Sequence, residues 1–330
     1  MKRSWLLVIF GLIIAGILAM SWKPPVSKSS LKTHGVTFSN RCVTEHFVVY
    51  SDYSGEQTAF LARFAEDFRT MIDRDYFVLK PAAPMEILIF RDQKKYLGFA
   101  RPVGREDSLG FSANGYIAYL AYDDPNSNIF ASGKIGTLSH ELMHQFMMPR
   151  LDYSRYPWSS EAIPTFFEKM LGYYDDNGKP HFTVGYIHPD RLAITRDLLA
   201  KSPNLSVFYT TEAGFTNCSA RNTFLTYLHQ RRGGIGKYVR LRMENGDTEQ
   251  KILEKAYGKP LKVLEAEWRA WVKSNGSVPG PVNDANLVTM SLFTENQSDF
   301  EQWLIQRGSP SYDPVRKVYT FTSARKTANQ

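Results

Sequence analysis

Cysteine is scarce in this chain, which has only Cys42 and Cys218 among its 330 residues. Their spacing fits no cysteine-ligated metal site, so a zinc finger or zinc ribbon is excluded. In an oxidising compartment the two thiols can form one disulfide between distant parts of the chain. Two separate buried thiols are the alternative, and the sequence leaves both open.

The chain also lacks internal repeats and nucleic-acid-binding motifs. Its composition, 43% hydrophobic and 22% charged, is that of an ordinary globular protein. The formal net charge is +7, and part of it lies in Arg231-Arg232 and Lys237–Arg242. Such a cluster is typical of a solvated helix face, or of a surface that attracts anionic lipid, cell-wall polymer or an acidic substrate. Without a supporting motif, we expect no nucleic-acid partner.

The N-terminus carries the one long apolar run. Lys2 and Arg3 precede the stretch Trp5–Met20, which is the pattern of an export signal. Its length lies between a signal-peptide core and a short membrane span, so residues 1–22 are expected to be a signal peptide or a membrane anchor. The rest of the protein is then extracytoplasmic: membrane-anchored, or secreted or periplasmic. Residues 23–40 are expected to form a polar tether.

The sequence His140-Glu141-Leu142-Met143-His144 is a His-Glu-x-x-His motif. A helix is predicted from Lys134 to Met148, because Pro149 follows and no proline interrupts it. The two histidines lie one turn apart on one helix face, opposite an apolar stripe that packs inward. The stripe consists of Ile135, Leu138, Leu142 and Phe146.

Two imidazoles in this arrangement can bind one zinc ion, and the intervening carboxylate can then accept a proton from a bound water. The pattern therefore predicts one Zn²⁺ per chain, with His140 and His144 as ligands and Glu141 as general base. Buried polar groups are costly unless something pairs with them, which also favours a metal.

A catalytic zinc site has three protein ligands and one open position. The third ligand is expected in a second helix, within Pro157–Glu168. Glu161 is our candidate. Glu168, seven residues later, is expected on the same helix face as a residue that supports a ligand or the fold. The alternative for Glu161 is a solvated carboxylate near a helix N-terminus.

His140–His144, followed by Trp158-x-x-Glu161 and Phe166-Phe167-Glu168, resembles the gluzincin peptidases. It is most similar to the peptidase-MA-like domain of exported bacterial proteins, and the resemblance extends from about His46 to Lys273. It implies a zincin-like fold, zinc bound by the two histidines and Glu161, and Glu141 as the base. It also implies a peptide or protein substrate.

The expected fold class is α+β. Residues 41–149 are predicted to form a zincin-like lobe with a mixed sheet and the motif helix, and residues 150–273 a mainly helical lobe with the third ligand. Residues 274–330 are a tail to which we assign no role. Strands are expected at His46–Ser51, Met85–Phe90 and Tyr116–Tyr122. The third is either an open edge that can pair with a substrate or an ordinary inner strand.

Further elements are predicted from apolar spacing and from turn residues. These are a hairpin tip at Asp175–Gly178 and helices at Gln93–Phe99, Arg191–Ala200, Ala220–Gln230, Ile235–Glu244, Thr248–Ala256, Leu261–Lys273 and Phe300–Leu304.

Peptide hydrolysis needs a donor that stabilises the oxyanion besides the metal. Tyr209, Tyr227 and His229 are the candidates in the helical lobe, and His188 is a weaker one. The sequence thus predicts an exported zinc-dependent peptidase. The alternatives are a non-catalytic envelope binding or assembly module on the same fold, or a zinc amidase acting on cell-wall peptides. The sequence does not determine the oligomeric state.

Overall fold

The computed structural model describes part of the chain, namely residues 26–27, 31–80, 83–113, 115–121, 133–208, 214–275, 291–307, 309–313 and 318–322. The apolar N-terminal segment lies outside these residues. None of the helices in the described ranges is both long and apolar enough to cross a membrane.

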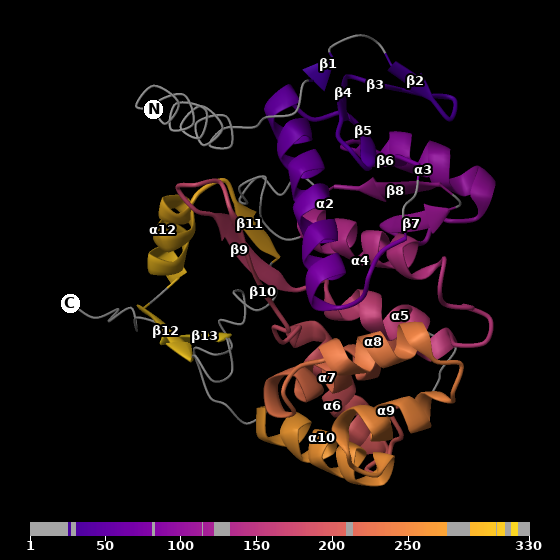
Figure 1. Ribbon diagram of the computed structural model, residues 1–330, viewed down its shortest axis with the longest axis vertical. Helices are drawn as coiled ribbons and strands as arrows, with labels where there is room; N and C mark the ends of the chain where they lie inside the picture. The colour runs from indigo at the N-terminus through magenta and orange to yellow at the C-terminus, as the bar shows by residue number, and fades with distance from the viewer. Residues whose placement is uncertain are drawn as a thin grey trace, which may run out of the picture.

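A six-stranded mixed sheet forms the upper half of the molecule in Figure 1. Its three central strands are parallel and its outer strands antiparallel. In spatial order the strands are β1 (Val26–Ser27), β4 (Asn40–Val43), β5 (Phe47–Ser51), β6 (Met85–Phe90), β8 (Tyr116–Leu120) and β7 (Gly110–Ala113).

Helices cover both faces of this sheet. On one face lie α2 (Gly55–Asp75) and α4 (Gly133–Met147), and on the other α3 (Gln93–Ala100), followed by the short helix η1 (Arg101–Val103). Because both faces of the sheet are covered, the side chains of strand β6, which point alternately to the two faces, pack into two different cores. Ile87 and Ile89 belong to the core beneath α2 and α4, whereas Leu88 and Phe90 belong to the smaller core beside α3.

The expected tether is wrong for residues 31–38, which form a hairpin of β2 (Leu31–Thr33) and β3 (Val36–Phe38). Its turn places His34 and Gly35 at positive φ, a region that glycine enters readily. Phe38 is buried in the smaller core. The hairpin therefore belongs to the folded body.

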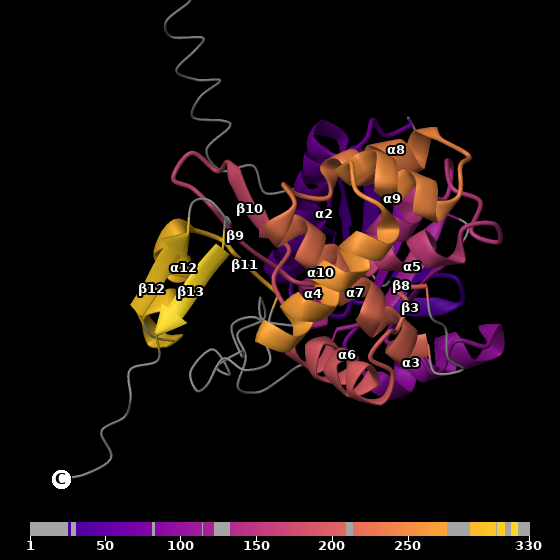
Figure 2. The ribbon, with the colours of Figure 1, turned by 90° about the horizontal axis from the view of Figure 1, so that it is seen from below.

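The second half of the described chain is mainly helical (Figures 1 and 2). Its helices are α5 (Pro157–Phe166), α6 (Pro189–Lys201), α7 (Gly214–Arg231), α8 (Gly236–Glu244), α9 (Glu249–Tyr257) and α10 (Leu261–Asn275). Helices α5 and α6 both pack on α7, and α5 also contacts α4. The described residues thus combine helices with mixed sheets, which is compatible with the predicted α+β class.

A second, three-stranded sheet includes part of the tail. Strand β9 (Met170–Tyr174) pairs with β10 (Pro180–Val184) in a hairpin and, on its other side, with β11 (Leu292–Thr294). The turn predicted at Asp175–Gly178 lies at this hairpin's tip and is confirmed. Helix α12 (Gln297–Arg307) packs on the same sheet, to one side of the molecule in Figure 2, next to the hairpin of β12 (Ser309–Asp313) and β13 (Val318–Thr322).

Four expectations are corrected or decided by the structure. Strand β8 is an inner strand, between β6 and β7, and β7 is the edge. Helix α5 ends at Phe166, so Glu168 does not share its face with Glu161. The cysteines are separate thiols, Cys42 buried and Cys218 half-buried. Of the basic cluster, Arg242 is fully buried rather than solvated.

Candidate metal centre

The His-Glu-x-x-His segment lies in α4, as predicted. The apolar stripe of Ile135, Leu138 and Leu142 is completely buried against the sheet and α2. Met143 and Met147 are also buried, so the helix is enclosed on nearly all sides. Since helical side chains at i and i+4 share a face, both histidines project to the side where α5 packs on α4.

Three side chains meet there and can hold a metal ion: His140, His144 and Glu161. Their donor atoms all lie within 4.8 Å of one another. The two Nε2 atoms are 3.0 Å apart, and each is 3.7 Å from an oxygen of Glu161. Glu161 is the fifth residue of α5, so two helices supply the donor set.

The Nδ1 atom of each histidine has a hydrogen-bond partner that determines which ring nitrogen carries the proton. The Nδ1–H of His140 donates to Glu168 Oε1 at 2.9 Å. The Tyr153 hydroxyl donates to the carbonyl of His144 at 2.8 Å, so its oxygen is left to accept from His144 Nδ1 at 3.2 Å. When both rings are neutral, both Nε2 atoms therefore present lone pairs to the same space.

Two facing lone pairs repel each other unless a cation lies between them. Burial by itself lowers the pKa of His140, but the hydrogen bond to Glu168 and three nearby carboxylates raise it to about 9. Burial and the His140 charge hold the pKa of His144 well below its usual value. The site thus attracts one positive charge to the space between the rings, and the donor set fits a metal ion there.

Glu168 lies behind His140, outside the pocket that the metal donors line. Arg191, at the start of α6, donates to both oxygens of Glu168 at 2.8–3.1 Å. Burial raises the pKa of Glu168, but Arg191 and His140 outweigh it and hold that pKa at about 2. The carboxylate is therefore ionised and orients the ring of His140. The hydroxyl of Ser291, from the tail, donates to the Glu168 carbonyl.

Glu141 lies against strand β7. Ser112 donates through its hydroxyl to Glu141 Oε2 and to the Glu141 carbonyl, both at 2.9 Å. Burial raises the pKa of the Glu141 carboxyl. Gly110 permits this approach, because a Cβ there would lie 2.8 Å from Thr137 and 3.3 Å from the Glu141 side chain.

The metal donors open into a cavity of about 350 Å³ between β7, α4 and α5. Glu141, Ser112 and Tyr153 line it together with the three donors, and Arg105, which follows η1, is the only arginine or lysine among the described residues of its lining. Residue patterns did not identify Ser112, Tyr153, Arg105 or Arg191. The position of Tyr153 could have predicted that it lies near the site, since it falls between His144 and Glu161 in the short connection from α4 to α5.

The candidate oxyanion donors that lie in described parts of the chain are not brought to this cavity. The Tyr227 hydroxyl donates to Glu267 Oε2 at 2.7 Å, and the His229 ring packs on Phe166 with 5.2 Å between ring centroids. Neither lines the cavity, nor does His188, whose pKa burial lowers to about 3. Tyr209 lies outside the described residues. The described side chains that line the cavity and can donate a hydrogen bond include Tyr153, Arg105, Ser108 and Ser112.

Glu161→Gln is expected to weaken metal binding far more than Glu168→Gln does. Glu161 would offer its oxygens to a bound ion, whereas Glu168 would act through His140, and loss of such a supporting partner typically costs about 10- to 100-fold in affinity. Competition with a chromophoric chelator measures both affinities. If Glu168→Gln is the more damaging change, Glu161 is not the third ligand.

No protein-family model matches the chain, and no curated protein sequence matches it. The interpretation of the site therefore rests on its own geometry.

Proposed function

We propose that the protein is an exported zinc-dependent peptidase and that residues 41–149 form a zincin-like lobe. The observation that carries the proposal is the convergence of His140, His144 and Glu161 next to Glu141 in one open cavity. Two imidazoles and one carboxylate are a donor set that suits zinc and leaves a coordination position open. Bound zinc would supply a Lewis acid that polarises a carbonyl and lowers the pKa of water.

Glu141 is positioned for proton transfer. Its carboxylate lines the cavity beside the two histidines and accepts a hydrogen bond from Ser112, which fixes its orientation. A carboxylate with a raised pKa can accept a proton from the attacking water and return it to the departing amine. Tyr153 and Arg105 line the same cavity and are the groups available to stabilise negative charge on the substrate.

Strand β7 offers an edge along which the backbone of a peptide substrate can bind. It is the edge of the six-stranded sheet, and Gly110, Phe111 and Ser112 line the cavity. An edge strand has unpaired backbone groups that an extended peptide can join. For Tyr116–Leu120 the alternative of an ordinary inner strand holds, so the proposed docking edge is β7, which sequence patterns did not identify.

Cleavage of a peptide library by the purified chain tests the function. Zinc-loaded protein should cleave peptide bonds, chelation should stop cleavage, and added zinc should restore it. Absence of cleavage across peptide and envelope substrates, with zinc bound, would favour the non-catalytic binding or assembly module.

A reporter fused after Gln330 should be active only outside the cytoplasm. Lys2 and Arg3 ahead of Trp5–Met20 are expected to send everything downstream across a membrane. The measurement compares alkaline phosphatase, which is active outside, with a cytoplasmic reporter at the same junction. A matched chain without residues 1–22 should reverse the result. Cytoplasmic activity of the full-length fusion contradicts export.

A further inference from the structure

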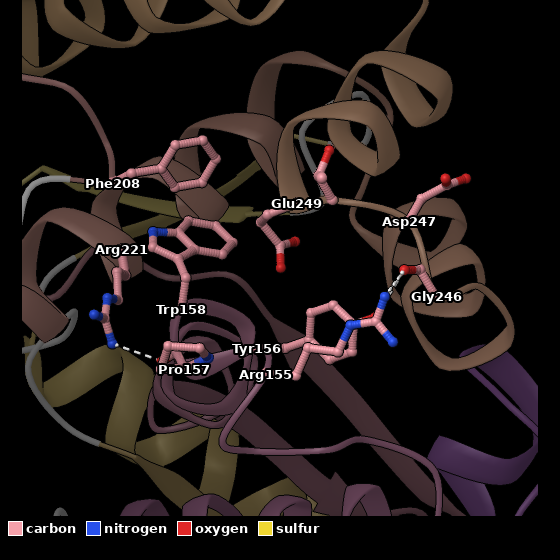
Figure 3. Close-up of a pocket in the computed structure, with 10 residues that line it drawn as sticks. Arg155, Tyr156, Pro157, Trp158, Phe208, Arg221, Gly246, Asp247 and Glu249 are labelled. Carbon is pink, nitrogen blue, oxygen red and sulfur yellow. Dashed lines mark hydrogen bonds between the residues drawn. The ribbon is translucent and has the colours of Figure 1, made fainter.

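A second cavity, of about 370 Å³, lies between α5, α7 and the connection from α8 to α9 (Figure 3). We call it the Trp158 cavity. It shares no lining residue with the cavity at the metal centre. Its volume is within the usual range of small-molecule sites, about 300 to 1,000 Å³. The lining residues are Arg155, Tyr156, Pro157, Trp158, Phe208, Arg221, Gly246, Asp247, Thr248 and Glu249.

Arg221 brings a buried positive charge to this cavity. The residue is only 6% exposed, and within the described parts of the chain it forms no ion pair. Its one hydrogen bond there runs from Nη1 to the carbonyl of Pro157 at 3.2 Å, although a guanidinium has five N–H donors. A buried charge without a counter-charge is strongly unfavourable. An anion in the cavity would compensate it.

The acidic residues of the lining do not supply that counter-charge. Glu249 already accepts from Tyr238 at 2.7 Å and lies 3.7 Å from the guanidinium of Arg242. Asp247 is exposed, and Figure 3 shows its side chain pointing away from Trp158. Arg155 donates to the carbonyl of Gly246 on the same side. Arg155 is exposed to solvent, so among the described residues of the lining the buried charge without a counter-charge is that of Arg221.

The wall beside Arg221 is aromatic. The indole of Trp158 lies next to the guanidinium in Figure 3, and Phe208 lies above the indole. The two rings meet edge to face, with 5.5 Å between centroids. The indole N–H already donates to the carbonyl of Val207 at 2.9 Å, so the ring offers the cavity its apolar surface. Flat apolar groups pack well on such surfaces.

We propose that the Trp158 cavity binds a small carboxylate with an aromatic body. The carboxylate lies on Arg221, and the ring lies against Trp158 and Phe208. Planar carboxylates suit a guanidinium because they accept two parallel hydrogen bonds. This chemistry belongs both to free aryl carboxylic acids and to the C-terminal aromatic residue of a peptide. The inference is independent of the proposed peptidase activity.

Isothermal titration calorimetry of the wild-type chain tests the ligand class. The probes are 3-phenylpropionate and N-acetylphenylalanine, for the free acid and the peptide end, each with its neutral carboxamide. We expect each acid to bind about 10- to 100-fold more tightly than its amide, the usual value of a hydrogen bond to a charged group. Tighter binding of 3-phenylpropionate indicates a free aryl carboxylic acid as the ligand, and tighter binding of N-acetylphenylalanine indicates the C-terminal residue of a peptide. Equal binding of acid and amide, or no binding of any probe at millimolar concentration, overturns the proposal.

Variants then test whether Arg221 is the residue whose charge binds the carboxylate of the ligand. Arg221→Gln should remove the preference for acid over amide, and Arg221→Lys should retain part of it. Arg240→Gln is the matched control, because it removes an exposed arginine that does not line the cavity and should leave the preference unchanged. A preference that survives in Arg221→Gln overturns the proposal. If Arg221→Gln fails to fold, the acid–amide comparison in wild type and in Arg240→Gln still decides the ligand class.

Discussion

Glu141→Gln is expected to abolish nearly all peptide cleavage while zinc remains bound. None of the three donor atoms belongs to Glu141, and glutamine occupies almost the same volume beside Ser112. The variant loses only the group that accepts the proton, and general-base catalysis is typically worth about 100- to 10,000-fold. The measurement is the cleavage rate of one library-derived peptide at equal zinc content.

The control for this experiment is Glu244→Gln, an exposed glutamate at the end of α8. It carries the same chemical change away from the site and should leave the rate unchanged. Zinc content and thermal unfolding of both variants exclude loss of metal or fold. A Glu141→Gln variant that cleaves at the wild-type rate would remove Glu141 from the mechanism.

The second large effect is expected for the metal itself. Wild-type protein should hold about one zinc per chain, and His144→Ala or His140→Ala should hold none in stoichiometric amount. Each change removes one of three donors. The affinity lost should therefore exceed the roughly 10- to 100-fold that is lost with a supporting partner. Mass spectrometry under native conditions and atomic emission give the metal content.

His181→Ala serves as the matched variant, because His181 pairs with Asp175 in the β9–β10 hairpin and lies outside the metal-donor group. It should keep one zinc per chain. Full zinc retention in both His140→Ala and His144→Ala would show that the ion binds elsewhere.

Much of the fold could be predicted because local patterns were strong. Helix α4 was placed within a residue at each end, since its apolar stripe is regular and Pro149 follows it. Strand β6 was predicted with its observed bounds from the β-branched and aromatic run Met85–Phe90. Strand order is different, because it depends on pairing between distant segments. The sequence could not show that β7 lies outside β8.

The supporting residues of the site depend on such distant contacts. Ser112 meets Glu141 only because Gly110 lets β7 approach α4, and Arg191 meets Glu168 across the connection to α6. Tyr227 was a candidate by residue type alone, and its side of α7 faces Glu267 of α10 instead. Motif spacing identifies donors that share a helix. It does not show which residues from other elements orient them.

The division of the three donors between α4 and α5 has a consequence for the protein's lifetime. An ion held there would link two packed helices that residues 148–156 connect along the chain, so separation of the two helices would require release of the ion. Free ion at about a thousand times its Kd would add about 4 kcal/mol against that opening. Loss of the ion would then expose the connection to proteolysis, and the amount of folded protein would follow the local supply of the ion.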